Sequence, residues 1–226
     1  MKLTFKDRAA LMQAAAERMA KALNDAIAAR GGACLALSGG STPEAAYRAL
    51  AEMKLDWRNV TFALIDERFV PPSDEASNQA MLERALAHAF TAGAQLKPMF
   101  FATSTAAQAA DRADALYAPL HIDVAVMGMG VDAHTASWFP GVAAHALDLN
   151  TSRTVVAVHA LGATGSPDRL TLTRSAYNRA AGALLIITGY DKRERLEKAR
   201  AEPVEEAPVA ALFAPAAPPL EIFWAP

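Results

Sequence analysis

The chain has 226 residues, a formal net charge of -2, and a composition that is 53% hydrophobic and 20% charged. This length and composition suit an ordinary globular protein with one well-cored domain, which we expect to span residues 1–226. The charge excludes the broad basic face of a nucleic-acid binder, and the lack of a signal peptide or membrane-length apolar run predicts a cytoplasmic protein without a membrane partner.

Hydrophobic patterning predicts helices and strands that alternate along the chain. An amphipathic helix is expected from Asp7 to Arg30, and Gly31-Gly32 ends it. Strands are expected at Cys34–Ser38, Val60–Ile65, Ile122–Met127, Thr154–Val158 and Ala183–Thr188. Helices are expected at Pro43–Met53, Ser77–Phe90 and Ser104–Tyr117. This alternation indicates an α/β fold, with a Rossmann-like, largely parallel sheet flanked by helices.

The last part of the chain is rich in Pro and Ala but still carries two apolar segments. Val209–Phe213 and Leu220–Trp224 are interpreted as terminal strand or packing segments, so this region is not a linker. Together they leave room for a small C-terminal lobe. The sequence carries no signature of a particular oligomeric state.

A Gly-Ser-Thr loop between the first apolar strand and its helix suits a phosphate group. Its residues are Ser38, Gly39, Gly40, Ser41 and Thr42. Thr42 can cap the helix with Pro43 in the first turn, or Ser41 and Glu44 can form a capping box. Either way, N–H groups and hydroxyls converge at a positive helix end, where phosphates bind. A plain capped turn is the alternative, and Ser38 also fits a degraded nucleophile elbow of a serine hydrolase.

Two arginines are candidate contacts for an anion. Arg68 follows Asp66 and Glu67 at the end of the second apolar strand, and arginine pairs with phosphate through two parallel hydrogen bonds. The polar loop Pro71–Asn78 is long enough to reach over a pocket. Arg169 begins an alternating segment and can supply a second positive contact. A surface ion pair and an exposed strand residue are the respective alternatives.

The segment Gly128–Gly141 predicts a catalytic loop. It follows the apolar strand Ile122–Met127, turns at Gly128 and Gly130, and then delivers Asp132 and His134. Histidine is the side chain best suited to exchange a proton near neutral pH. A structural histidine is the alternative.

The same glycines also match a dinucleotide-binding fingerprint, with Ala133 as its last small residue and Asp148 as the acid downstream. That hypothesis is rejected, because Pro140 interrupts the required helix early and Asp148 precedes the next strand instead of ending it. A metal site is not expected, since the remaining histidines are scattered and no Cys pair or H-E-x-x-H motif occurs. They are His88, His121, His145 and His159.

Together these segments resemble the 6-phosphogluconolactonases, which share a superfamily with the glucosamine-6-phosphate isomerase/deaminases. The matching motifs occur in order: Leu37-Ser-Gly-Gly-Ser-Thr-Pro43, Asp66-Glu-Arg68, the loop Gly128–Gly141, and Arg169-Leu-Thr-Leu-Thr173. Where the deaminases place a glutamate before the proline, this chain has Phe139, which favours the lactonase branch. Ala133 departs from the family, which usually has glycine there.

The resemblance implies a carboxylic ester hydrolase of the oxidative pentose phosphate pathway that converts 6-phospho-D-glucono-1,5-lactone to 6-phospho-D-gluconate without a cofactor. His134 would be the general base that activates water, and Asp132 would orient it. The phosphate would bind the loop Gly39–Thr42 with Arg68 and Arg169. Asp66 would contact sugar hydroxyls or transfer a proton. The N–H groups of Gly128 and Gly130 are candidate oxyanion donors.

Two other functions stay open at this point. One is a deaminase/isomerase acting on glucosamine 6-phosphate. The other is a non-catalytic sugar-phosphate sensor, although no basic helix-turn-helix precedes the first helix. All three share a small phosphorylated sugar as the partner.

Overall fold

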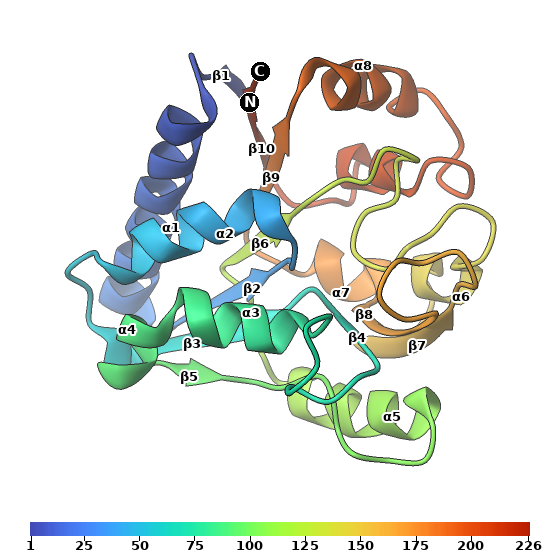
Figure 1. The fold of residues 1–226 in the computed structure, drawn as a ribbon, viewed down its shortest axis with the longest axis horizontal. Helices are drawn as coiled ribbons and strands as arrows, with labels where there is room; N and C mark the ends of the chain where they lie inside the picture. The colour runs from blue at the N-terminus through green and yellow to red at the C-terminus, as the bar shows by residue number, and fades with distance from the viewer.

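A computed structural model describes residues 1–226 and contains two sheets (Figure 1). The main sheet has seven strands in the order β1-β10-β9-β6-β2-β3-β5, and every pairing within it is parallel. Its strands are β1 Lys2–Thr4, β2 Ala33–Leu37, β3 Val60–Leu64, β5 Gln95–Leu96, β6 Val124–Met127, β9 Ala183–Thr188 and β10 Leu220–Ala225. The α/β fold with a parallel sheet is therefore confirmed.

The second sheet is small and antiparallel. It has the order β4-β8-β7, with β4 Asp66–Arg68, β8 Asp168–Leu172 and β7 Val155–His159. The expected strand at Thr154–Val158 is β7, so it does not join the parallel sheet. Its link to β8 is short, and a parallel crossover needs a dozen or more residues.

The smaller structural unit is also not C-terminal as expected. Strand β10 pairs with β1 and β9 inside the main sheet, so the end of the chain belongs to the central layer. Of the two alternatives for Val209–Phe213, a strand or a packing segment, the second is confirmed: it forms the 3₁₀ helix η2, Pro208–Phe213, with Val209 and Leu212 buried. The unit outside the main sheet is built from the middle of the chain.

Helices cover both sides of the main sheet. Figure 1 shows α1, α2 and α3 on one side and the small sheet with α5, α6 and α7 on the other. The helices are α1 Arg8–Arg30, α2 Ser41–Ala51, α3 Asn78–Ala85, α4 Ala87–Thr91, α5 Ala106–Tyr117, α6 Ala144–Leu147, α7 Arg174–Asn178 and α8 Tyr190–Ala199, with the 3₁₀ helix η1 at Trp57–Asn59. None of them is long and apolar enough to cross a membrane.

Helix ends follow the expected signals in some places and differ in others. Gly31 ends α1 as expected, with a left-handed φ of +77°, and Asp7 caps the start of α1 by accepting the Ala10 N–H at 2.8 Å. The expected helix Ser77–Phe90 is two helices, because Leu86 leaves the helical conformation between α3 and α4.

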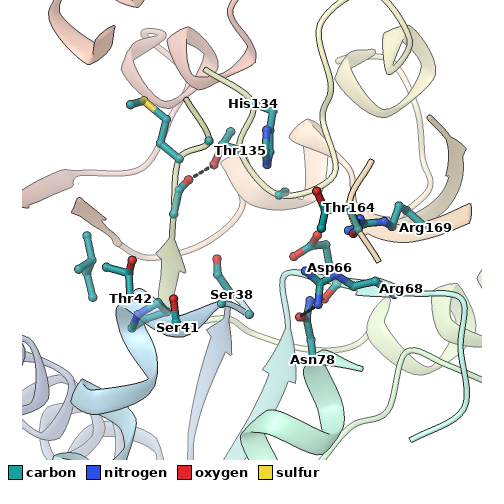
Figure 2. A pocket seen from close by; sticks show the side chains of 18 of the residues that line it. Ser38, Ser41, Thr42, Asp66, Arg68, Asn78, His134, Thr135, Thr164 and Arg169 are labelled. Carbon is teal, nitrogen blue, oxygen red and sulfur yellow. Dashed lines mark hydrogen bonds between the residues drawn. The ribbon is translucent and has the colours of Figure 1, made fainter. Parts of the chain in front are cut away.

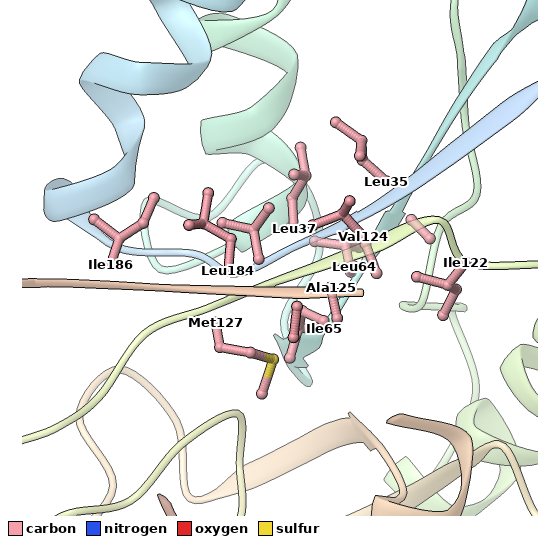
Figure 3. Close-up of a cluster of buried hydrophobic side chains, with 14 of the residues drawn as sticks. Leu35, Leu37, Leu64, Ile65, Ile122, Val124, Ala125, Met127, Leu184 and Ile186 are labelled. Carbon is pink, nitrogen blue, oxygen red and sulfur yellow. The ribbon is translucent and has the colours of Figure 1, made fainter. Parts of the chain in front are cut away.

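The core holds the carboxyl ends of the central strands in place. Figure 3 shows Leu35 and Leu37 of β2 packed with side chains of the neighbouring strands. These neighbours include Leu64, Val124, Leu184 and Ile186, all of which are buried. Close packing on both faces explains why these strands are continuous apolar runs. The loops that follow β2, β3 and β6 therefore leave a rigid platform at one edge.

Candidate functional site

A pocket of about 310 Å³ lies at this edge and gathers most of the expected site residues (Figure 2). The expected residues that line it are Ser38, Gly39, Gly40, Ser41, Thr42, Asp66, Arg68, Gly128, Gly130, His134 and Arg169. It is also lined by residues to which the sequence gave no individual role in binding or catalysis, among them Asn78, Thr135, Phe139, Thr164 and Lys192. Segments more than a hundred residues apart thus converge on one cavity.

His134 and Asp132 form a hydrogen-bonded dyad on the loop after β6. His134 Nδ1 lies 2.5 Å from Asp132 Oδ1, and the His134 backbone N–H donates to the same oxygen at 3.1 Å. The hydrogen bond from His134 is the main reason that the pKa of Asp132 lies below its ordinary value. An ionised carboxylate can only accept, so Nδ1 carries the proton and Nε2 is left free to take one. The dyad has the arrangement of a general base and its orienting group.

Gly130 is required by the dyad. A Cβ at Gly130 would lie 2.2 Å from His134 Nδ1 and 2.6 Å from Asp132 Oδ1, so any side chain would displace them. Its N–H donates to the His134 carbonyl oxygen at 2.9 Å. The expectation that this N–H is free for an oxyanion is therefore wrong. Gly128 keeps that candidacy, and its carbonyl oxygen accepts the Thr135 hydroxyl at 2.8 Å.

Ala133, which departs from the family pattern, has a backbone conformation that glycine adopts more easily. It is fully buried and has φ of +67°, a left-handed conformation that favours glycine. Its carbonyl oxygen accepts the Val209 N–H at 3.0 Å, which ties the loop to η2. The extra methyl group therefore adds backbone strain but leaves the dyad geometry in place.

The Gly-Ser-Thr loop places an open helix N-terminus at the pocket. Helix α2 begins at Ser41 with Gly40 as its N-cap and has no side-chain cap. The expected caps, Thr42 or the pair Ser41 and Glu44, are therefore wrong, because the helix starts earlier than Pro43 predicted. The hydroxyls of Ser41 and Thr42 therefore do not cap the helix, and they lie beside its unpaired first N–H groups. This arrangement of donors binds phosphate.

Ser38 does not act as the expected alternative nucleophile in this geometry. Its hydroxyl donates to the Val126 carbonyl oxygen at 2.6 Å, and its own carbonyl oxygen accepts the Tyr47 hydroxyl at 2.9 Å. Both bonds fix the strand end that leads into the loop. A hydroxyl that donates to a backbone carbonyl has no general base to activate it.

The two expected arginines lie opposite each other on neighbouring strands of the small sheet. Arg68 and Arg169 are directly opposite in the β4–β8 pairing. Arg169 is only 4% exposed, and burial lowers its pKa, while the charge of Asp66 opposes that effect. Its Nε donates to the Ser166 carbonyl oxygen at 2.8 Å, and a second nitrogen donates to that of Thr164. Like charges opposite one another repel, so this pair favours a bound anion.

The side chains of the segment Ser137–Phe139 contact residues of the site and of strand β8. The Ser137 hydroxyl donates to Asp66 Oδ2 at 2.7 Å, and Trp138 Nε1 donates to the Leu172 carbonyl oxygen at 2.7 Å. The Phe139 ring centroid lies 4.9 Å from that of His134 and 5.6 Å from the Arg169 guanidinium carbon. Phe139 therefore separates the base from the arginine and contacts both.

Lys192 adds a positive side chain that none of the sequence motifs predicted. It lies in the first turn of α8 and lines the pocket, and burial lowers its pKa. Its neighbours in sequence are charged as well, so nothing distinguishes it before the fold is known.

In Figure 2, Ser41 and Thr42 lie on one side of the pocket, and Arg68 and Arg169 lie on the other.

The other histidines stay away from the pocket. His88, His121, His145 and His159 do not line it. No group of three or more His, Cys, Asp or Glu side chains is arranged to hold a metal ion. The polar groups of the pocket are hydroxyls, N–H groups, cations and the carboxylate of Asp66, which suit a phosphorylated, hydroxyl-rich molecule.

Comparison with known proteins finds 6-phosphogluconolactonases both by sequence and by structure. A family model for glucosamine-6-phosphate isomerases/6-phosphogluconolactonase matches residues 6–224. A 6-phosphogluconolactonase from Rhizobium meliloti is 45% identical over 98% of this chain and 97% of its own. Another from Mesorhizobium japonicum is 41% identical over 98% and 94%. A crystal structure of a 6-phosphogluconolactonase from Shewanella baltica has a TM-score of 0.94 and 32% identity, covering 100% of this chain and 97% of that one.

Proposed function

This chain belongs to the glucosamine-6-phosphate isomerase/6-phosphogluconolactonase family, and on that premise we propose that it hydrolyses 6-phospho-D-glucono-1,5-lactone to 6-phospho-D-gluconate. The observation that carries the proposal is the His134–Asp132 dyad at a pocket that also holds an open helix end and three cationic side chains. A base supplies the hydrolysis, and the cations supply the affinity for the phosphate. A role in the oxidative pentose phosphate pathway, in the cytoplasm, belongs to the same proposal.

Binding uses the polar walls of the pocket. The phosphate would be held by the N–H groups and hydroxyls of the loop Gly39–Thr42, together with charge from Arg68 and Arg169. Lys192 adds charge to the same cavity. Asp66, fixed by Ser137, accepts hydrogen bonds from sugar hydroxyls. These contacts hold the lactone ring against His134.

The chemistry needs one base that becomes an acid. His134 Nε2 takes a proton from water while the water oxygen attacks the C1 carbonyl carbon, and the carbonyl oxygen becomes an oxyanion. The Gly128 N–H is the candidate donor to that oxyanion. Collapse of the tetrahedral intermediate breaks the bond from C1 to the ring oxygen, which receives the proton from His134. Asp132 stabilises the imidazolium in between.

The direct test is to measure loss of freshly generated 6-phosphogluconolactone by the purified protein, with the spontaneous rate subtracted. We expect rapid hydrolysis of the lactone and no turnover of glucosamine 6-phosphate. The aromatic side chain of Phe139 before Pro140 leaves no acid there for the isomerase reaction. Turnover of the amino sugar would move the chain to the deaminase branch. Inactivity on both substrates, with binding of either, would favour a sensor.

Arg169→Ala and Arg68→Ala should each raise KM for the phosphorylated lactone by roughly tenfold to a hundredfold, since a hydrogen bond to a charged group contributes about 1.5–3 kcal/mol. The fall in kcat should be smaller. Steady-state kinetics would measure both constants, and thermal unfolding would show that each variant folds. Arg112→Ala is a matched control, because Arg112 is exposed on α5 and lies outside the pocket. An unchanged KM in both variants would contradict the proposed phosphate site.

A further inference from the structure

We infer that Asn78 is a positioning residue for the reaction, which holds Arg68 against the phosphate loop without neutralising its charge. Asn78 is the first residue of α3 and belongs to none of the motifs that indicate the function. The inference deepens the proposed function and rests on it, because it concerns how Arg68 meets the substrate.

Each polar atom of the Asn78 side chain is used within the site. Its Oδ1 accepts from an Arg68 guanidinium nitrogen at 2.9 Å, and its Nδ2 donates to the Asp66 carbonyl oxygen at 2.8 Å. The residue is 2% exposed. The same Arg68 nitrogen also donates to the Ala76 carbonyl oxygen at 2.6 Å. Two acceptors on one nitrogen fix the plane of the guanidinium, so its other donors have a set direction.

Asn78 also touches the phosphate loop. A Cβ at Gly39 would lie 1.8 Å from Asn78 Oδ1 and 2.2 Å from Asn78 Cγ. Gly39 is not among the glycines with positive φ, so its backbone would accept other residues. The glycine is therefore required by the amide of Asn78. In Figure 2 the Asn78 side chain extends toward Arg68 from the end of α3. One side chain thus connects the loop after β2 with the arginine of β4.

Glu67 anchors Asn78 from behind. Its carboxylate is fully buried and accepts the backbone N–H groups of Arg68, Asn78 and Gln79, each at 2.7 Å. It also accepts the Ser77 hydroxyl at 3.0 Å. The start of α3 is therefore tied directly to β4. This anchor gives the Asn78 side chain a fixed origin.

The chemistry of the amide explains why it suits this place. A carboxylate here would form an ion pair with Arg68 and compete with the phosphate for its charge. An apolar side chain would leave the guanidinium free to move and its nitrogen with one acceptor fewer. The neutral carbonyl oxygen of Asn78 orients Arg68 and leaves its full positive charge for the substrate.

A double-mutant cycle with Arg68 tests the inference. Asn78→Ala should lower kcat/KM for the phosphorylated lactone by roughly tenfold, mainly through KM, since about 1.4 kcal/mol corresponds to a factor of ten. In an Arg68→Ala background the same change should alter kcat/KM by less than about twofold. A residue that merely supports α3 would cause equal losses in both backgrounds, and that result would overturn the inference.

A second variant keeps the test valid if Asn78→Ala does not fold. Asn78→Leu has nearly the same volume and adds no charge, and it should raise KM in the Arg68 protein and change KM by less than about twofold in the Arg68→Ala protein. Equal effects in both would again contradict the inference. Asn150→Ala is the control, because Asn150 is exposed and outside the pocket. Failure of the wild-type protein to hydrolyse the lactone would instead refute the proposed function, so the two failures are distinguishable.

Discussion

Replacing His134 with alanine should lower kcat for the phosphorylated lactone by roughly a hundredfold or more, which is the usual effect of losing a general base. The dyad places Nδ1 at the Asp132 carboxylate and leaves Nε2 as the basic atom at the pocket. No other histidine lines the cavity, so no second imidazole can replace it. The loss should appear in kcat, because in the proposed mechanism His134 acts on water and the phosphate binds elsewhere in the pocket.

Initial rates of lactone loss, corrected for spontaneous hydrolysis, would measure the effect. His88→Ala is the matched control, because His88 is an exposed histidine on α4 outside the pocket, and its removal should leave kcat unchanged. Thermal unfolding of both variants would show whether they fold. Turnover by His134→Ala at the wild-type rate would mean that another group activates water, and the proposed mechanism would be wrong.

The sequence indicated the site through residues that are local to strand ends. Apolar runs predicted the parallel strands, and parallel strands bring the residues after their carboxyl ends to one edge. The polar residues after β2, β3 and β6 therefore had to meet, as Ser41, Asp66 and His134 do. The second arginine was found by its sequence context, and the pairing of β4 with β8 places it opposite the first.

Other parts of the site depend on contacts that no local pattern encodes. In the sequence, Asn78 is one residue of a polar segment. Its role depends on contacts with Gly39 and Arg68, which form only in the folded chain. Lys192 is one of several charged residues at the start of α8, and only the fold selects it. The cap of α2 was also missed, because Pro43 suits a first turn wherever that turn begins. Propensity predicts elements, whereas tertiary contacts set their ends.

Asp132→Asn should lower kcat by roughly a hundredfold, nearly as much as the loss of His134. The hydrogen bond from His134 holds the pKa of Asp132 below its ordinary value of about 4. A carboxyl group with a lowered pKa stays ionised above that value and takes up a proton only as the pH falls below it. Near neutral pH the wild-type dyad therefore always contains a carboxylate, and asparagine removes a charge that is always present.

Comparison of Asp132→Asn with Asp132→Ala separates orientation from charge. Asparagine can donate its amide N–H to His134 Nδ1, which would move the imidazole proton to Nε2 and remove the base. Alanine cannot, so it leaves both tautomers available. A lower kcat for asparagine than for alanine would show that Asp132 selects the tautomer, and equal losses would assign its effect to charge. Asp148→Asn, on an exposed turn outside the pocket, should keep wild-type kcat. Wild-type kcat in both Asp132 variants would mean that His134 acts as the base without help from the carboxylate. That result would exclude Asp132 from the mechanism.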